Sequence, residues 1–135
     1  MATGLENLWI YRLAEDLEIK IHEVTKSFPS DEIFRSVDQL RRSSTSASDN
    51  INEGYHKGTL KEKLRFFTIS KGEVEETKRK LIKSDRKKFL SFETATQIAE
   101  EYTVLIKGIS GYMKFLKLNE LDNHMLISKP KKPSN

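Results

Sequence analysis

Apolar side chains recur every three or four positions through four stretches of the chain, and short polar or glycine-containing segments separate these stretches. This spacing keeps the repeating residues on one face of a helix. The first stretch runs from Leu5 to Phe28, and Pro29 disfavours helical geometry at the residue before it. We therefore predict that the first helix ends at Phe28. Its repeating positions are Ile10, Leu13, Leu17, Ile21, Val24 and Phe28.

The second stretch differs from the others because its repeating positions narrow from large to small side chains. Ser30 is placed to cap a helix whose first turn carries Asp31 and Glu32, where the helix dipole favours negative charge. The helix is predicted to run to about Gly54. Small residues on a buried face let another helix backbone approach, so we expect this helix to be central and tightly packed. The repeating positions are Val37, Leu40, Ser44, Ala47, Ile51 and Gly54.

The third predicted helix has the weakest apolar face. It begins at Thr59 and Glu62, which have the spacing of a capping box. Gly72 costs about 1 kcal/mol against alanine in mid-helix, and it predicts a close helix crossing. The apolar stripe is interrupted by lysines at two positions. It comprises Leu60, Leu64, Phe67, Val74 and Leu81, with Lys71 and Lys78 between them.

The fourth stretch has the most regular repeat, and Ser91 is placed to cap it. Four helices joined by short turns predict an all-α domain, an antiparallel up-down four-helix bundle over residues 1–121. Residues 122–135 are predicted to be a disordered basic tail, in which Lys129, Lys131 and Lys132 could form a weak flexible arm. The repeating positions of the fourth helix are Ile98, Tyr102, Leu105, Ile109, Tyr112 and Leu116.

Composition limits the classes of protein to which the chain can belong. A chain of 135 residues can bury a core without disulfides or metal. It has no cysteine, which removes thiolate chemistry, cysteine-based zinc sites and a disulfide framework. No apolar run approaches the roughly 18 residues of a membrane span, and acidic residues close to the start do not fit a signal peptide. We expect a soluble, cytoplasmic protein without a membrane partner.

Positive charge is concentrated in the third quarter of the chain. Residues 1–56 carry 6 Lys/Arg and 10 Asp/Glu, residues 57–88 carry 12 and 5, and residues 89–135 carry 6 and 5. The basic segment is either a solvated helix face or a footprint for a nucleic-acid backbone, whose binding would be salt-sensitive and tolerant of sequence. No helix-turn-helix or aromatic-interleaved RNA platform is evident. The candidate nucleic-acid-binding residues are Lys71, Lys78, Arg79, Lys80, Lys83, Arg86, Lys87 and Lys88.

A polar ladder is predicted along the second helix, where residues four apart stack on one side. Acid before base at this spacing is a favourable orientation, so the ladder is expected to be paired, inside the bundle or between subunits. The other interpretation is that Arg41 and Arg42 contact phosphate, although such arginines are more often paired. The candidate structural or interface residues are Asp38, Arg41, Arg42, Ser46, Asn50, Glu53 and Gly54.

Catalytic or metal chemistry is not indicated by any spacing in the chain. His22, His56 and His124 are scattered and form no metal motif. The carboxylates that could bridge metals in a bundle lack the Glu-x-x-His signature. The glycines at 54 and 58 follow a helix and not the strand that a phosphate loop requires. We predict no enzyme activity, no metal and no cofactor.

A resemblance to a known family appears in several short segments, of which residues 39–54 are the most specific. The chain resembles a bacterial four-helix bundle protein family that is encoded in intervening sequences of large-subunit ribosomal RNA genes. That family is related to the accessory variability determinant of diversity-generating retroelements. The matching residues are Leu8-Trp9, Ala14, Thr25 to Glu32, Gln39 to Arg42, Ser46, Asn50-Ile51, Glu53-Gly54, Phe66-Phe67, Gly72 and Glu76.

The resemblance implies a bundle that assembles with itself into a homopentameric ring, without known catalysis. It also implies two kinds of partner, RNA or DNA on the one hand and a reverse transcriptase or another protein on the other. The alternative is an oligomeric protein-interaction scaffold that binds no nucleic acid. This chain has Ser43-Ser44, Ala47-Ser48-Asp49 and Asn52 where the family usually has Ala-Ala, Ile-Pro-Ala and Ala. Its second helix is therefore more polar than the family pattern.

Overall fold

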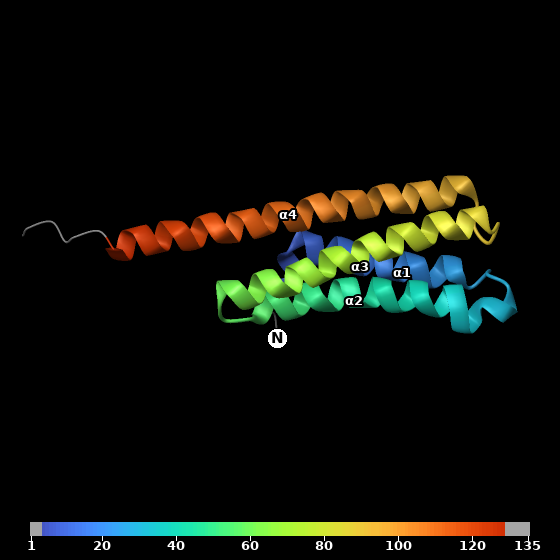
Figure 1. Cartoon of the computed structure of the whole chain (residues 1–135), viewed down its shortest axis with the longest axis horizontal. Helices are drawn as coiled ribbons and strands as arrows, with labels where there is room; N and C mark the ends of the chain where they lie inside the picture. The colour runs from blue at the N-terminus through green and yellow to red at the C-terminus, as the bar shows by residue number, and fades with distance from the viewer. Residues whose placement is uncertain (1–3, 129–135) are drawn as a thin grey trace, which may run out of the picture.

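The computed structural model describes the backbone of residues 4–128 and the side chains of residues 4–123 (Figure 1). This part of the chain contains four long helices and no strand: α1 (Trp9–Thr25), α2 (Asp38–His56), α3 (Leu60–Arg86) and α4 (Phe92–Ser128). Each helix runs antiparallel to the one before it, and α4 also packs on α1, so the four helices form a closed bundle. The predicted all-α four-helix architecture is confirmed.

The entry into α2 differs from the prediction of one continuous helix starting at a Ser30 cap. A short 3-10 helix, η2 (Ser30–Glu32), leads into a π-helix, η3 (Ile33–Val37), before α2 begins. No side-chain cap is made at the start of η2. Instead, the Glu32 carboxylate accepts hydrogen bonds from the Ser36 backbone nitrogen at 3.3 Å and from the Ser36 hydroxyl at 2.8 Å. A carboxylate is a stronger acceptor than a serine hydroxyl, so the cap lies at Glu32.

The α2–α3 seam is as tight as the small residues of α2 predict. The Ser70 hydroxyl donates to the backbone carbonyl of Ala47 at 2.7 Å, and the Thr77 hydroxyl donates to the Ser43 hydroxyl at 2.7 Å. Short polar side chains therefore fill the core side of α3 and find partners on α2. The buried residues of α3 are Phe67, Ser70, Val74, Thr77, Leu81 and Ser84.

This register corrects two predictions about α3. Lys71 and Lys78 do not occupy the seam; they lie beside it and are half-buried, because Ser70 and Thr77 take the core positions. Gly72 does not mark a helix crossing, since a Cβ built there would have no heavy atom within 4 Å. The close approach of α2 and α3 occurs at Gly54 instead. A Cβ at Gly54 would lie 3.2 Å from the Lys63 carbonyl oxygen and from atoms of two phenylalanine side chains.

The predicted N-caps at Thr59 and Ser91 are confirmed, but the return bond of a capping box, from the Thr59 backbone nitrogen to the Glu62 side chain, is absent from the described structure. Thr59 accepts from the Glu62 backbone nitrogen at 3.2 Å, and Ser91 accepts from the Thr94 backbone nitrogen at 3.1 Å. The α4 helix continues to Ser128, past the expected domain boundary at residue 121, and projects beyond the other helices (Figure 1). The tail lysines, at positions 129, 131 and 132, lie outside the described residues. None of the helices described is long and apolar enough to cross a membrane.

Candidate nucleic-acid interface

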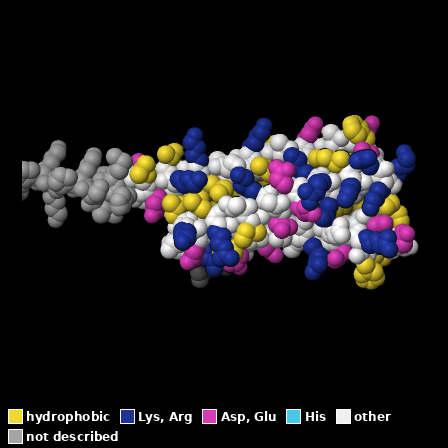
Figure 2. Space-filling model, viewed as in Figure 1, with side chains coloured by type: hydrophobic (Ala, Val, Ile, Leu, Met, Phe, Trp, Pro, Cys, Tyr) yellow, Lys and Arg dark blue, Asp and Glu magenta, His cyan; other side chains and the backbone are white. Residues whose placement is uncertain are grey.

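The predicted cations of α3 point to three sides of the helix. Arg79, Lys83 and Arg86 are spaced four and three apart, share the outer face and are exposed. Lys71 and Lys78 lie on one flank, and Lys80 lies on the opposite flank. In Figure 2, Lys and Arg side chains gather over the second half of α3, with acidic side chains between them. The predicted residues therefore surround the helix and do not form one flat patch.

The groove between α2 and α3 receives the cation on the inner flank. Lys80 lies there with Arg42 of α2 and two carboxylates of α3. Glu76 pairs with both Arg79 and Lys80, so its one negative charge offsets one of their two positive charges within the helix. The residues that line the groove are Gln39, Arg42, Ser43, Ser46, Glu73, Glu76 and Lys80.

The remaining cations of the predicted set are available to a ligand. Lys87 has its ammonium 6.0 Å from the ring centroid of Phe89, in a cation–π contact. Lys88 adopts a positive φ of 64°, which ends α3 and turns the chain toward α4. Within the part of the chain that the structure describes, six predicted cations make no ion pair, namely Lys87 and five others: Lys71, Lys78, Lys83, Arg86 and Lys88.

The α2 ladder is paired as predicted, but it lies on the surface of the chain and not inside the bundle. Arg42 lies 3.8 Å from the Asp38 carboxylate, and its side chain is 80% exposed. Asn50 donates to the backbone carbonyl and the hydroxyl of Ser46, at 2.8 and 3.1 Å. Glu53, the last rung, lies 3.7 Å from the ammonium of Lys57.

Arg41 has a structural position that the sequence did not reveal. Its Nε donates to the Thr25 hydroxyl at 2.9 Å, and its terminal nitrogen donates to the His22 carbonyl at 3.2 Å. The guanidinium therefore binds free acceptors at the C-terminal end of α1, where cations are favoured. This contact ties α2 to α1 and uses the donors that phosphate would need.

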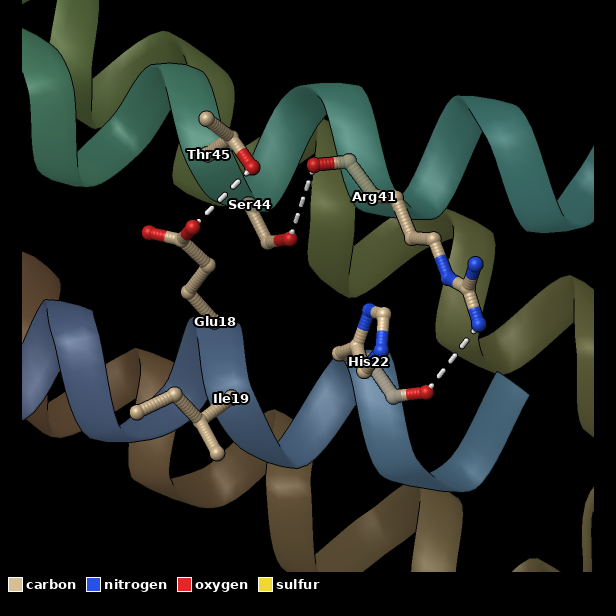
Figure 3. Close-up of a pocket in the computed structure, with 6 residues that line it drawn as sticks. All are labelled: Glu18, Ile19, His22, Arg41, Ser44 and Thr45. Atoms are coloured by element: carbon tan, nitrogen blue, oxygen red, sulfur yellow. Dashed lines mark hydrogen bonds between the residues drawn. The ribbon is translucent and has the colours of Figure 1, made fainter. Parts of the chain in front are cut away.

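A pocket of about 170 Å³ lies beside this contact, between α1 and α2 (Figure 3). The Glu18 carboxylate accepts from the Thr45 hydroxyl at 3.2 Å and from the Ser48 hydroxyl at 2.5 Å. The polar groups around the pocket thus bind one another, and we interpret them as a polar link between α1 and α2. The residues that line the pocket are Glu18, Ile19, His22, Arg41, Ser44 and Thr45.

One buried polar atom lies near this link. The Tyr102 hydroxyl is enclosed in the core and has no hydrogen-bond partner among the described residues. Burial raises the pKa of Tyr102 well above its usual value, and the negative charges of Glu18 and Glu101 raise it further. The group is therefore a neutral phenol at physiological pH. The described residues contain no group of histidine, aspartate and glutamate side chains arranged to hold a metal ion.

A second surface, which we name the outer face of α4, was not predicted. Val104, Phe115 and Leu118 lie exposed on one line of the helix. Gly111 lies on the same line and is open to solvent, whereas Gly108 lets Trp9 of α1 pack against the edge of the stripe, because a Cβ there would collide with the Trp9 ring. Beside it lies a groove of about 430 Å³. The residues that line the groove are Trp9, Val104, Lys107, Gly108, Gly111 and Tyr112.

Comparisons with known proteins place this geometry in context. The family model described as "23S rRNA-intervening sequence protein" matches residues 6–111. No curated protein matches the chain. A solved structure of a protein of unknown function from the S23 ribosomal protein family of Bacteroides thetaiotaomicron VPI-5482 is similar, with a TM-score of 0.72 and 21% identity. The alignment covers 78% of this chain and 95% of that one, and at this identity it shows the fold alone.

Proposed function

The chain belongs to the family of 23S rRNA-intervening sequence proteins, and from this premise we propose that it is a non-catalytic, homo-oligomeric protein of the cytoplasm that binds the phosphate backbone of RNA or DNA. The surface that we assign to this task comprises the outer face of α3, the flank that carries Lys71 and Lys78, and the turn after the helix. The observation that carries the proposal is the set of predicted cations with neither an ion pair nor a cation–π contact in the described structure, Lys71, Lys78, Lys83, Arg86 and Lys88.

The positions of these cations fit a polyanion better than a small ligand. Lys71 and Lys88 are separated by roughly 25 Å along the helix, at 1.5 Å per residue. Successive phosphates of a strand can meet cations over that length, whereas the described pockets on α3 offer no enclosed anion site. Long lysine side chains contact phosphates as point charges and do not read base edges. Binding should therefore tolerate any sequence and weaken with salt.

Assembly is the second part of the proposal. The family resemblance implies a homopentameric ring, and the outer face of α4 offers apolar surface that this chain alone leaves exposed, including Val104, Phe115 and Leu118. Several copies of a weak basic surface in one assembly would add their contacts through multivalency. An oligomer would thus bind nucleic acid more tightly than the modest positive charge of one chain allows.

The outer face of α4 also favours a second candidate function. An apolar groove beside Trp9 and two glycines suits a protein contact better than a nucleic-acid contact. The alternative is therefore an oligomeric protein-interaction scaffold, with a reverse transcriptase or another protein as partner and with the α3 cations serving only solubility.

A binding titration with charge-reversed variants separates the two functions. We expect the wild type to retain structured RNA and duplex DNA at low salt, and the double variant Lys83→Glu/Arg86→Glu to lose both. Lys114→Glu/Lys117→Glu, on exposed positions of α4, makes the same change in net charge and should keep binding. Equal retention by all three proteins, or no retention by the wild type, would favour the scaffold. The mass of each protein in solution, measured in parallel, tests the assembly.

A further inference from the structure

Two connections between helices meet at one end of the bundle, which we name the η3 end. They are the segment from α1 through η2 and η3 into α2, and the turn from α3 to α4. The Phe28 and Phe89 rings, one from each connection, lie with their centroids 5.6 Å apart. Besides the Ser36 hydrogen bonds, the charge of Lys87 helps to lower the pKa of Glu32. The two connections therefore form one continuous surface.

Aromatic side chains stand exposed on this surface. Phe34, in η3, is 91% exposed, and Phe92, at the start of α4, is 68% exposed. The π-helical turn of η3 presents three consecutive residues to solvent, Ile33, Phe34 and Arg35. In Figure 2 apolar side chains protrude over η3 and over the start of α4, at opposite edges of this end. π-helical turns are frequent at functional sites. A phenylalanine ring as exposed as that of Phe34 contributes no hydrophobic burial to the stability of the fold.

Exposed cations share this end of the bundle with the rings. Arg35, Lys83, Arg86 and Lys88 are exposed and make no ion pair within the described structure. Carboxylates share the same end, namely Asp31, Glu32, Asp85 and Glu93. The net charge at this end is therefore small. A polyanion that binds here needs an attraction besides charge, and the exposed rings can supply it.

We propose that the η3 end binds an unpaired, single-stranded stretch of RNA or DNA, with bases stacked on Phe34 and Phe92 and phosphates held by Arg35, Arg86 and Lys88. The inference deepens the proposed function and rests on it. In a duplex the faces of the bases are covered by their neighbours, whereas an unpaired base offers its face to an aromatic ring. Stacking of this kind does not depend on which base is present, which agrees with the absence of a base-reading element on α3.

The test compares binding of a fluorescently labelled oligo-uridine strand and a labelled RNA duplex by anisotropy. Phe34→Ala/Phe92→Ala should weaken binding of the single strand by roughly tenfold or more for each ring and leave duplex binding unchanged. Ile19→Ala is the control, because Ile19 is an exposed apolar residue, at 56%, on α1, away from the η3 end and from the outer face of α4. It should change neither affinity. All of these substitutions remove exposed apolar side chains, so the fold should persist, and circular dichroism checks it.

Each contrary result identifies what has failed. Unchanged single-strand binding in Phe34→Ala/Phe92→Ala, while Lys83→Glu/Arg86→Glu loses both ligands, would overturn this inference and leave the proposed function standing. An equal loss for strand and duplex would overturn it as well, because stacking acts only on unpaired bases. A wild type that binds neither ligand at low salt would refute the proposed function itself. A fall in solution mass of Phe34→Ala/Phe92→Ala would identify the rings as a protein interface, again against the inference.

Discussion

The salt dependence of duplex DNA binding gives the sharpest test of the α3 surface, because the number of available cations in the structure predicts how steep that dependence should be. Each phosphate neutralised by a cation contributes about −0.9 to the slope of log affinity against log salt for B-DNA. Five of the predicted cations make neither an ion pair nor a cation–π contact in the described structure: Lys71, Lys78, Lys83, Arg86 and Lys88. If one protomer uses all of them, the slope is about −4.5, and affinity falls roughly 500-fold between about 50 and 200 mM salt.

Substitutions that remove charge should change this slope by a predictable amount relative to the wild type. Lys83→Gln/Arg86→Gln removes two contacts without adding repulsion, so the slope should change to about −2.7 and the same salt step should cost roughly 40-fold. Lys114→Gln/Lys117→Gln, on α4, makes the same change in charge and should keep the wild-type slope. Arg79→Gln should also keep it, because Arg79 already pairs with Glu76.

Anisotropy of a short labelled duplex, measured at five or more salt concentrations, gives all of these slopes. A ring in which several protomers touch the same duplex would steepen the wild-type slope but preserve the order of the variants. A wild-type slope shallower than about −1.8, the value for two contacts, would show that the α3 cations do not form the footprint. The same slope in Lys83→Gln/Arg86→Gln and in the wild type would place the footprint elsewhere.

Three further predictions concern assembly and stability. Gly111→Leu fills the α4 groove at a position where a Cβ would touch nothing in the chain, so light scattering should show a smaller assembly than for the wild type. Gly72→Leu, at an equally open position on α3, is the control and should keep the wild-type mass. Equal masses for the two variants would exclude the groove from assembly. Tyr102→Phe removes a buried hydroxyl without a partner in the described structure, so urea unfolding should show a gain of about 1 kcal/mol, and a loss would reveal a hidden partner. The Ser36 hydrogen bond holds the pKa of Glu32 below its usual 4.5, so the ionised carboxylate stabilises the fold above that pH and the benefit is lost as pH falls through the folded pKa. The stability advantage of wild type over Glu32→Gln should therefore shrink on acidification, and a constant difference in the thermal midpoint would contradict this.

The parts of the fold that depend on apolar periodicity could be predicted from the sequence. The buried residues of α1 and α4, such as Leu17 and Leu105, lie where the heptad pattern places them. The tight α2–α3 contact also follows from the small residues of α2. In these elements the burial of carbon surface decides the structure, and the hydrophobic pattern reports it directly.

The errors arise where polar groups decide the structure. Ser70 and Thr77 look like surface residues on any hydropathy scale, but hydrogen bonds to α2 allow them to occupy the core. The π-helical entry to α2 depends on the bond between Glu32 and Ser36, which has no hydrophobic signature. The spacing of Glu76, Arg79 and Lys80 was a readable signal, because i,i+3 and i,i+4 pairs are neighbours on a helix, and it would have removed two cations from the predicted site.

The position of Glu76 determines where the usable charge of α3 lies. By pairing with Arg79 and Lys80, Glu76 lowers the positive charge at the centre of the basic segment and leaves Lys83, Arg86 and Lys88 available near the η3 end. Backbone contact along α3 and base stacking at the η3 end would then be two parts of one path, with Arg86 and Lys88 shared by both. Reversing the charges of Lys83 and Arg86 should therefore weaken single-strand and duplex binding alike, whereas removing the rings should affect the single strand alone.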